Sequence, residues 1–188
     1  MDFFELAAGR RSVRAYLDTP VTEEQVQRIL ACGHGAPSGG NLKEWRFIVI
    51  RDPEQKLRVI DATYSRNNES NPPQEWLAEA PVLIAVAADL SVAAGRYGRH
   101  GIDSLVYLDC ACAVQNMLLA ACSLGLSSCF VSGFREHQMG EALGLPPELE
   151  AVALLPLGYA KVPGVKRPGA PVEDVTFFER YGEGPAAP

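Results

Sequence analysis

The longest apolar stretch of the chain reads LVYLDCACAVQNMLLAACSLGL and runs from Leu105 to Leu126. Asp109 and two amide side chains interrupt it, which favours a helix packed inside a protein over a membrane span. We predict a helix over residues 103–124 that stops at Gly125. Because this helix is apolar almost all round, we expect it in the centre of the fold or at an interface between subunits.

Shorter elements precede and follow this helix. The capping box Thr22-Glu23-Glu24-Gln25 starts a helix that ends near Cys32, and Asp52-Pro53 starts another that ends near Thr63. The apolar run 81–88 has the length of a strand that is buried on both faces. The other predicted elements are short helices at 2–8 and 135–143, strands at 45–51, 128–131 and 151–157, and a β-like patch at 172–178.

Loops are predicted where glycine, proline and polar residues gather. These segments are 33–41 and 67–74, and a Pro- and Gly-rich tail follows residue 161. Residues 96–101 form either a surface loop or a contact with a small ligand, and we favour the surface loop. The sequence contains no internal repeat or domain linker, so we expect one domain over residues 1–188.

The composition excludes several classes of function. Seventeen basic and 23 acidic residues give a net charge of −6, which argues against general affinity for nucleic acid. The N-terminal residues lack the basic and apolar regions of a signal peptide, and the five cysteines include no Cys-x-x-Cys pair. We therefore expect a cytoplasmic protein without a membrane partner, whose free thiols are mostly buried. His34, His100 and His137 are scattered, so no metal site is expected.

Three arginines lie within five residues near the N-terminus, in Gly9-Arg10-Arg11-Ser12-Val13-Arg14. Guanidinium groups match phosphate oxygens and the Ser12 hydroxyl adds a donor, so this segment suits a phosphate group. A solvated surface turn would have the same composition. A second basic pair, Lys166-Arg167, is either a second clamp on an anion or a solvated loop.

Two further segments have the composition of a ligand site. Ala36-Pro37-Ser38-Gly39-Gly40-Asn41 combines small residues that admit a flat ligand with hydrogen-bonding Ser and Asn side chains. An ordinary loop between a helix and a strand would also explain it. Val131-Ser132-Gly133 follows a predicted strand and precedes a predicted helix, where exposed backbone N–H groups can donate to a ligand.

Taken in this order, the segments resemble the nitroreductase family of FMN-dependent oxidoreductases. The family pattern begins with Arg-x-Ser-x-Arg and continues with Pro-Ser-x-x-Asn before Trp-x-Phe-x-Val. A central helix with Asp, Ala, Asn and Leu at fixed spacing follows, then Leu-Gly-Leu and Leu-Pro-x-Gly-Tyr. In this chain the matching residues are 10–14, 37–49, 109–121, 124–126 and 155–159. The resemblance therefore covers nearly the whole chain.

The resemblance implies an α+β fold with a mixed central sheet flanked by helices, and an intertwined homodimer with one FMN in each of two interface clefts. The C-terminal patch 172–178 would cross to the partner. The FMN phosphate and ribityl chain would contact Arg10, Arg11, Ser12, Arg14, Lys166 and Arg167. The flavin would contact Pro37, Ser38, Gly39 and Asn41 from the other subunit, and Val131, Ser132 and Gly133 near N5.

The chain departs from the family pattern in two places. Many relatives read Gln-Pro-Trp where this chain has Lys43-Glu44-Trp45, which changes the charge near the cleft. Some relatives place a lysine near flavin N1, where Gln74 or Asn71 would be a neutral donor in this chain. The chain is also short for the family, so the choice of acceptor cannot be carried over.

The implied activity follows from the cofactor. Hydride would pass from NAD(P)H through flavin N5 to a nitroaromatic, quinone or similar acceptor by a ping-pong mechanism, without a catalytic side chain. One alternative is specialised flavin chemistry on the same fold, such as flavin fragmentation or reductive dehalogenation. Another is a flavin-binding sensor or carrier without robust turnover.

Overall fold

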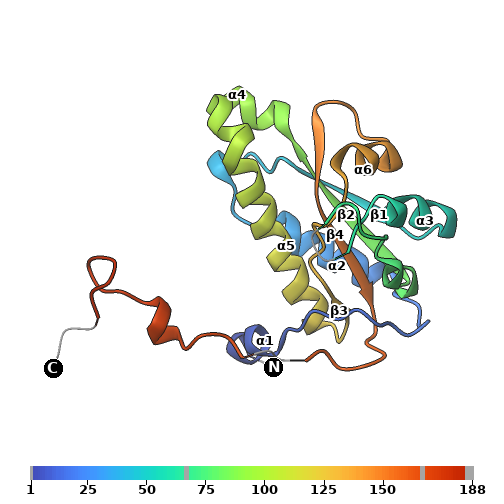
Figure 1. Ribbon diagram of the computed structural model, residues 1–188, viewed down its shortest axis with the longest axis horizontal. Coiled ribbons are helices and arrows are strands. Elements are labelled where there is room, and N and C mark those ends of the chain that lie inside the picture. The colour runs from blue at the N-terminus through green and yellow to red at the C-terminus, as the bar shows by residue number, and fades with distance from the viewer. Residues whose placement is uncertain (1, 66–67, 166–167, 185–188) are drawn as a thin grey trace.

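The computed structural model describes residues 2–65, 68–165 and 168–184, and its centre is a β-sheet with helices on both faces (Figure 1). Neighbouring strands in this sheet are antiparallel. A parallel bridge between Ser12 and Ser128 adds the N-terminal segment at one edge. The predicted α+β class is confirmed, and among the described residues the parallel pairing of the mixed sheet is confined to this bridge. In spatial order the strands are β1 (Trp45–Ile50), β2 (Val82–Asp89), β4 (Leu149–Gly158) and β3 (Ser127–Ser128).

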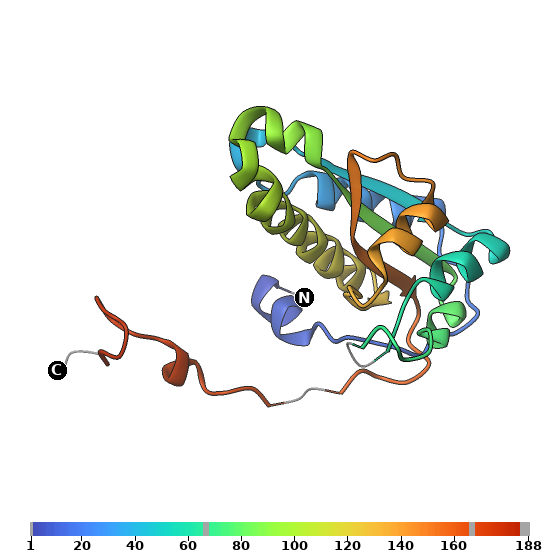
Figure 2. The same cartoon turned by 45° about the horizontal axis from the view of Figure 1, so that its top comes forward.

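The helices divide between the two faces of the sheet (Figure 2). One face packs against α2 (Glu23–His34) and α5 (Val106–Ser123), and the other against α3 (Pro53–Asp61) and α6 (Glu136–Leu143). As predicted, β2 is buried on both faces, since alternate residues along it join the two hydrophobic cores. The other helical segments are α1 (Phe3–Gly9), α4 (Leu90–His100), η1 (Gly39–Asn41), η2 (Glu75–Glu79), η3 (Gly101–Leu105) and η4 (Val172–Val175).

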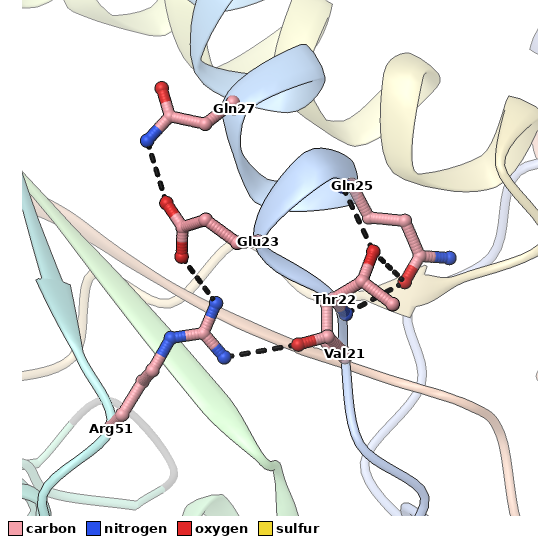
Figure 3. A network of polar contacts seen from close by, with 6 residues as sticks. All are labelled: Val21, Thr22, Glu23, Gln25, Gln27 and Arg51. Carbon is pink, nitrogen blue, oxygen red and sulfur yellow. Dashed lines mark hydrogen bonds and ion pairs between the residues drawn. The ribbon is translucent and has the colours of Figure 1, made fainter.

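The start of α2 has the cap that its sequence predicts (Figure 3). The Thr22 hydroxyl accepts from the Gln25 N–H at 3.2 Å, and the Gln25 side chain accepts from the Thr22 N–H at 3.0 Å. Arg51, which follows β1, donates to the Glu23 carboxylate at 3.1 Å and to the Val21 carbonyl at 3.0 Å. These bonds fix the start of α2 to the end of β1.

Residues 96–101 are helical, so the prediction of a surface loop there is wrong. They belong to α4 and to the π-helical turn η3, which leads directly into α5. Gly98 has a φ of 56° and Gly101 packs against the Ala93 carbonyl, so these glycines serve a kink and a close contact within one helical run. This run, Leu90–Ser123, is long and apolar enough to cross a membrane by length and composition alone. However, α5 packs on α2 and the sheet, as a core helix would.

Two β predictions also need correction. Residues 172–175 form the 3₁₀ turn η4 in an exposed tail that lies away from the sheet (Figures 1 and 2). A β-like sequence needs a neighbouring strand to pair with, and in one copy of the chain this tail has none among the described strands. The strand expected at 128–131 ends at Ser128, and Val131 forms a single bridge to Leu154.

The cysteines are free, but fewer of them are buried than predicted. Cys110 and Cys129 are buried and Cys122 is half-buried, whereas Cys32 and Cys112 are exposed. The apolar sequence around Cys112 does not bury it, because that side of α5 faces outward in one copy of the chain.

Candidate functional site

The arginine segment is held at the β3 edge of the sheet by Val13. This side chain is buried, and its N–H donates to the Ser128 carbonyl at 3.1 Å. The extended backbone alternates, so Ser12 and Arg14 on either side of Val13 are exposed. A buried anchor thus presents a hydroxyl and a guanidinium at the surface.

A hollow of about 1180 Å³ opens beside this segment. It is lined by segments that lie far apart in the sequence: the N-terminal segment, Tyr64 and Gln74 before β2, the turn after β3 and the chain after β4. The predicted site residues that line it are Arg10, Arg11, Ser12, Arg14, Gln74, Val131, Ser132 and Gly133. Lys166 and Arg167 lie outside the described residues, although Val162 to Val165 just before them also line the hollow.

The arginines of the hollow differ in their partners. Within residues 2–65, 68–165 and 168–184, neither Arg10 nor Arg14 forms a salt bridge. Arg14 lies over the Trp76 ring at 5.8 Å from its centroid. Arg11 instead donates from Nη1 to the carbonyls of Ala8 and Arg10, at 2.6 and 2.8 Å. Arg10 and Arg14 are therefore the cations that an anion could use, and Arg11 also fixes the local backbone.

The turn at Ser132 and Gly133 is fixed by hydrogen bonds from Tyr64 and Gln74. The Gly133 carbonyl accepts from the Tyr64 N–H at 2.9 Å and from the Gln74 amide at 3.2 Å. A Cβ at Gly133 would come within 3.0 Å of the Tyr64 carbonyl, so a larger residue would displace the turn. In the described part of the chain, the N–H groups of Ser132 and Gly133 donate no hydrogen bond to the protein. Both remain available to a ligand.

The two candidates for a neutral donor are placed differently. Gln74 lines the hollow, and its N–H donates to the buried Thr63 hydroxyl at 2.8 Å. The Asn71 amide donates to the Ser65 carbonyl at 2.9 Å, and Asn71 does not line the hollow. Sequence reasoning missed Tyr64, which lines the hollow and fixes Gly133 but belongs to no motif.

The loop with Pro37, Ser38, Gly39 and Asn41 does not line this hollow. The Gly39 N–H donates to the Asp109 carboxylate at 2.7 Å, in the first turn of α5. The Ser38 hydroxyl accepts from the Lys43 N–H at 3.0 Å, which closes the loop on itself.

The two parts of the predicted site lie at opposite ends of α5 in one copy of the chain (Figure 1). A smaller cavity next to Arg10 is lined by Leu118 and Cys122, near the end of the helix. With a rise of 1.5 Å per residue, Asp109 and Cys122 are about 20 Å apart along the helix axis. One copy of the chain therefore does not bring the two parts together.

The model of the Nitroreductase family matches residues 7–159. The chain belongs to this family. This nitroreductase-family chain is 34% identical over 157 residues to an Archaeoglobus fulgidus protein with the provisional name NADH dehydrogenase/NAD(P)H nitroreductase, across 81% of this chain and 82% of the relative. It is 31% identical over 179 residues to the 5,6-dimethylbenzimidazole synthase of Rhodospirillum rubrum, across 85% of this chain and 84% of that enzyme.

A solved structure shares the fold. A provisionally named nitroreductase of Exiguobacterium sibiricum, in complex with FMN, superposes with a TM-score of 0.82 at 22% sequence identity. The match covers 95% of this chain and 98% of that one. The family and the fold that the sequence motifs predicted are thus confirmed for this nitroreductase-family chain.

Proposed function

We propose that this chain is an FMN-dependent oxidoreductase that takes hydride from NAD(P)H and reduces an organic acceptor such as a nitroaromatic or a quinone. The observation that carries this proposal is the meeting of two kinds of donor in one hollow. Arg10 and Arg14 supply cations without a carboxylate partner in the described residues, and Ser132 and Gly133 supply unused N–H groups. This donor set fits the phosphate and the flavin ring of FMN.

The residues of the chain would bind and orient the cofactor, which supplies hydride transfer at N5 when bound. Arg10, Ser12 and Arg14 would hold the phosphate and ribityl chain, together with Arg11, Lys166 and Arg167. The free N–H groups of Ser132 and Gly133 would serve the N5 side of the ring, next to Val131, whose own N–H donates to the Leu154 carbonyl. The Gln74 amide would be a neutral donor in the same hollow. Tyr64 keeps the Gly133 turn in place through its N–H.

The proposed functional unit is a homodimer of one FMN-binding domain, residues 1–188, per copy. Two observations support it. The outward side of α5 carries the apolar side chain of Leu108, which is 61% exposed in one copy. The loop with Pro37, Ser38, Gly39 and Asn41 does not line the hollow of its own chain and lies toward the other end of α5 (Figure 1), so a second copy would supply it. We further propose a cytoplasmic enzyme without a nucleic-acid or membrane partner, on its net charge of −6 and the core packing of α5.

A kinetic experiment tests the activity. The FMN-loaded protein is mixed anaerobically with NADH or NADPH, and flavin bleaching is followed before a nitroaromatic or a quinone is added. We expect bleaching, then reoxidation, and parallel initial-rate lines when both substrates are varied, because both would need the one hollow. If neither nucleotide bleaches the flavin, the oxidoreductase proposal is contradicted. The remaining alternative is then a flavin-binding sensor or carrier. Intersecting lines would contradict the ping-pong order alone.

Flavin fragmentation is the second candidate, and the Rhodospirillum rubrum relative is the observation that favours it. Aerobic incubation of the reduced protein with excess FMN separates the two reactions. An oxidoreductase returns the flavin absorbance in full after each cycle. Stoichiometric loss of flavin, with release of a benzimidazole product, would support fragmentation instead.

A further inference from the structure

Glu44 is a buried carboxyl group at the point where the Pro37–Asn41 loop enters β1. The residue is 1% exposed, and its Oε2 atom has no hydrogen-bond donor among the described residues. Glutamate at such depth is rare unless it is paired or protonated. The function proposed above does not use this group.

The neighbour that explains Glu44 is Asp109 of α5. The two carboxyl groups lie close enough to share a hydrogen bond, and such a bond requires a proton on one of them. Burial makes the largest contribution to the raised pKa of Glu44, and Asp109 also raises it. A hydrogen bond from the backbone of Glu44 and the charge of Arg46 act in the opposite direction, but the net shift is upward. Glu44 is therefore the partner that holds the proton. The Asp109 carboxylate also accepts the Gly39 N–H at 2.7 Å, so the pair reaches directly into the loop.

The loop needs such external contacts because its backbone is strained. Gly40, Asn41 and Lys43 have φ values of 57°, 58° and 51°, in the left-handed region. This conformation is strained for the two residues that are not glycine. Strained backbone persists where surrounding contacts hold it. Here such contacts include the bond from Gly39 to Asp109, which comes from outside the loop, and the bond from Lys43 to Ser38 within it.

We propose that Glu44 is a positioning residue for the flavin-lining loop: its carboxyl proton is donated to Asp109, which holds Asp109 against the Gly39 N–H. The effect on FMN rests on the proposed function, in which this loop contacts the flavin from the neighbouring copy. The arrangement makes the loop sensitive to pH, because ionised Glu44 loses its donor and repels Asp109.

The other charged or titratable groups that face Glu44 do not replace it as the titrating group. Cys110 of α5 has its thiol pKa raised to about 12, by burial first and then by Glu44 and Asp109, so it stays neutral at physiological pH. Arg46 of β1 stays charged and pairs with Asp89 at 2.6 Å. The pKa of Glu44 is raised in the folded chain. The stabilisation of the fold by protonated Glu44 is therefore fully present below the unfolded pKa and is lost as pH rises through the folded pKa.

The first test compares FMN affinity as a function of pH in the full-length chain, using flavin fluorescence. Between about pH 5 and pH 9, the wild type should lose roughly five- to tenfold in affinity, the equivalent of one hydrogen bond. Glu44→Gln keeps an N–H donor toward Asp109 but cannot ionise, so its affinity should stay near the low-pH value. Glu44→Leu lacks the donor and should bind weakly throughout. The FMN phosphate titrates near about pH 6 in every variant, so the comparison cancels it.

The second test needs no FMN. The backbone amide resonance of Gly39 is followed by NMR in the flavin-free chain over the same pH range. It should shift with a single transition in the wild type, stay constant in Glu44→Gln, and show its transition at lower pH in Asp109→Asn, which removes the repelling charge. If the chain binds no FMN, the proposed function fails while the Gly39 resonance still decides the role of Glu44. A wild-type resonance without a transition overturns the inference, even if Glu44→Gln does not fold. A transition that persists unchanged in Glu44→Gln also overturns it.

Discussion

Ser12 forms a parallel bridge with Ser128, which joins the arginine segment to the strand that leads into the Ser132-Gly133 turn. The Val13 N–H reinforces the bridge by donating to the Ser128 carbonyl. The positive charges and the free N–H groups of the hollow therefore share one sheet edge, although their segments are distant in sequence. A ligand that uses both meets donors with a fixed separation, which favours tight binding.

Replacing Arg10 or Arg14 with alanine should weaken FMN binding by roughly ten- to hundredfold, because a hydrogen bond to a charged group contributes about 1.5–3 kcal/mol. Fluorescence titration measures the affinity. Arg28→Ala is the matched control, since Arg28 is an exposed residue of α2 outside the hollow. Equal affinities in all three variants would contradict the phosphate assignment.

Leu108→Lys should convert the proposed dimer to monomers and release its flavin, because the change places an unpaired charge in an apolar interface. Leu57→Lys on α3 is the control, with a starting exposure of 56% against 61% for Leu108. Sedimentation velocity at micromolar concentration measures the oligomeric state of each variant. If both variants sediment as the wild type does, Leu108 is not in the interface.

Thr63→Val should lower the free energy of unfolding by about 1–3 kcal/mol, since it removes the acceptor of the partly buried Gln74 N–H and the donor to the Ile60 carbonyl. The hydroxyl also donates to the Ile60 carbonyl at 2.6 Å, and Thr63 is fully buried. Urea denaturation measures the change. Thr176→Val in the exposed tail should stay within about 0.5 kcal/mol of the wild type, and a similar loss in both variants would argue against this role.

Asp89→Asn should change how stability depends on acid pH. Burial alone would raise the pKa of Asp89, but hydrogen bonds from Ser91 and Val92, with the charge of Arg46, outweigh it and leave the pKa lowered. The contribution of the Asp89 carboxylate to the free energy of unfolding is thus present above the unfolded pKa of about 3.9. It is lost as pH falls through the folded pKa.

At neutral pH the Asp89→Asn variant should be less stable by about 1 kcal/mol, a modest value because Arg46 is half-exposed. The stabilities of the two proteins should converge in urea-unfolding measurements as pH falls through the folded pKa of Asp89. A difference that stays constant from neutral to acid pH would show that the carboxylate charge is not responsible.

The sequence predicts the elements whose signals are local. The apolar length of α5, the two-sided burial of β2 and the capping box of α2 need no knowledge of the rest of the fold. The helix α4 escapes prediction because its glycines suggest a loop. A Cβ at Gly101 would lie 2.5 Å from the Ala93 carbonyl, so glycine is required there by a contact inside the helical run.

In the candidate site, too, some residues are predictable from local sequence and others only from the fold. Arginines beside a serine predict an anion contact from residue type alone, and the structure brings them to the hollow with Ser132 and Gly133. The role of Tyr64 comes from its backbone N–H, which every residue except proline possesses. The burial of Glu44 follows from its contact with Asp109 across the fold, and glutamate ahead of a strand is ordinarily exposed.

The separation of the two half-sites by α5 has a genetic consequence. In the proposed dimer, Arg10 of one copy and Asn41 of the other contact the same flavin. A homodimer of the Arg10→Ala chain, or of the Asn41→Ala chain, therefore has a defect in both of its flavin sites. In a mixed dimer of these two chains, both substitutions fall in one flavin site, and the other site has the wild-type residues. Two inactive alleles expressed in the same cell should therefore complement each other and restore flavin binding.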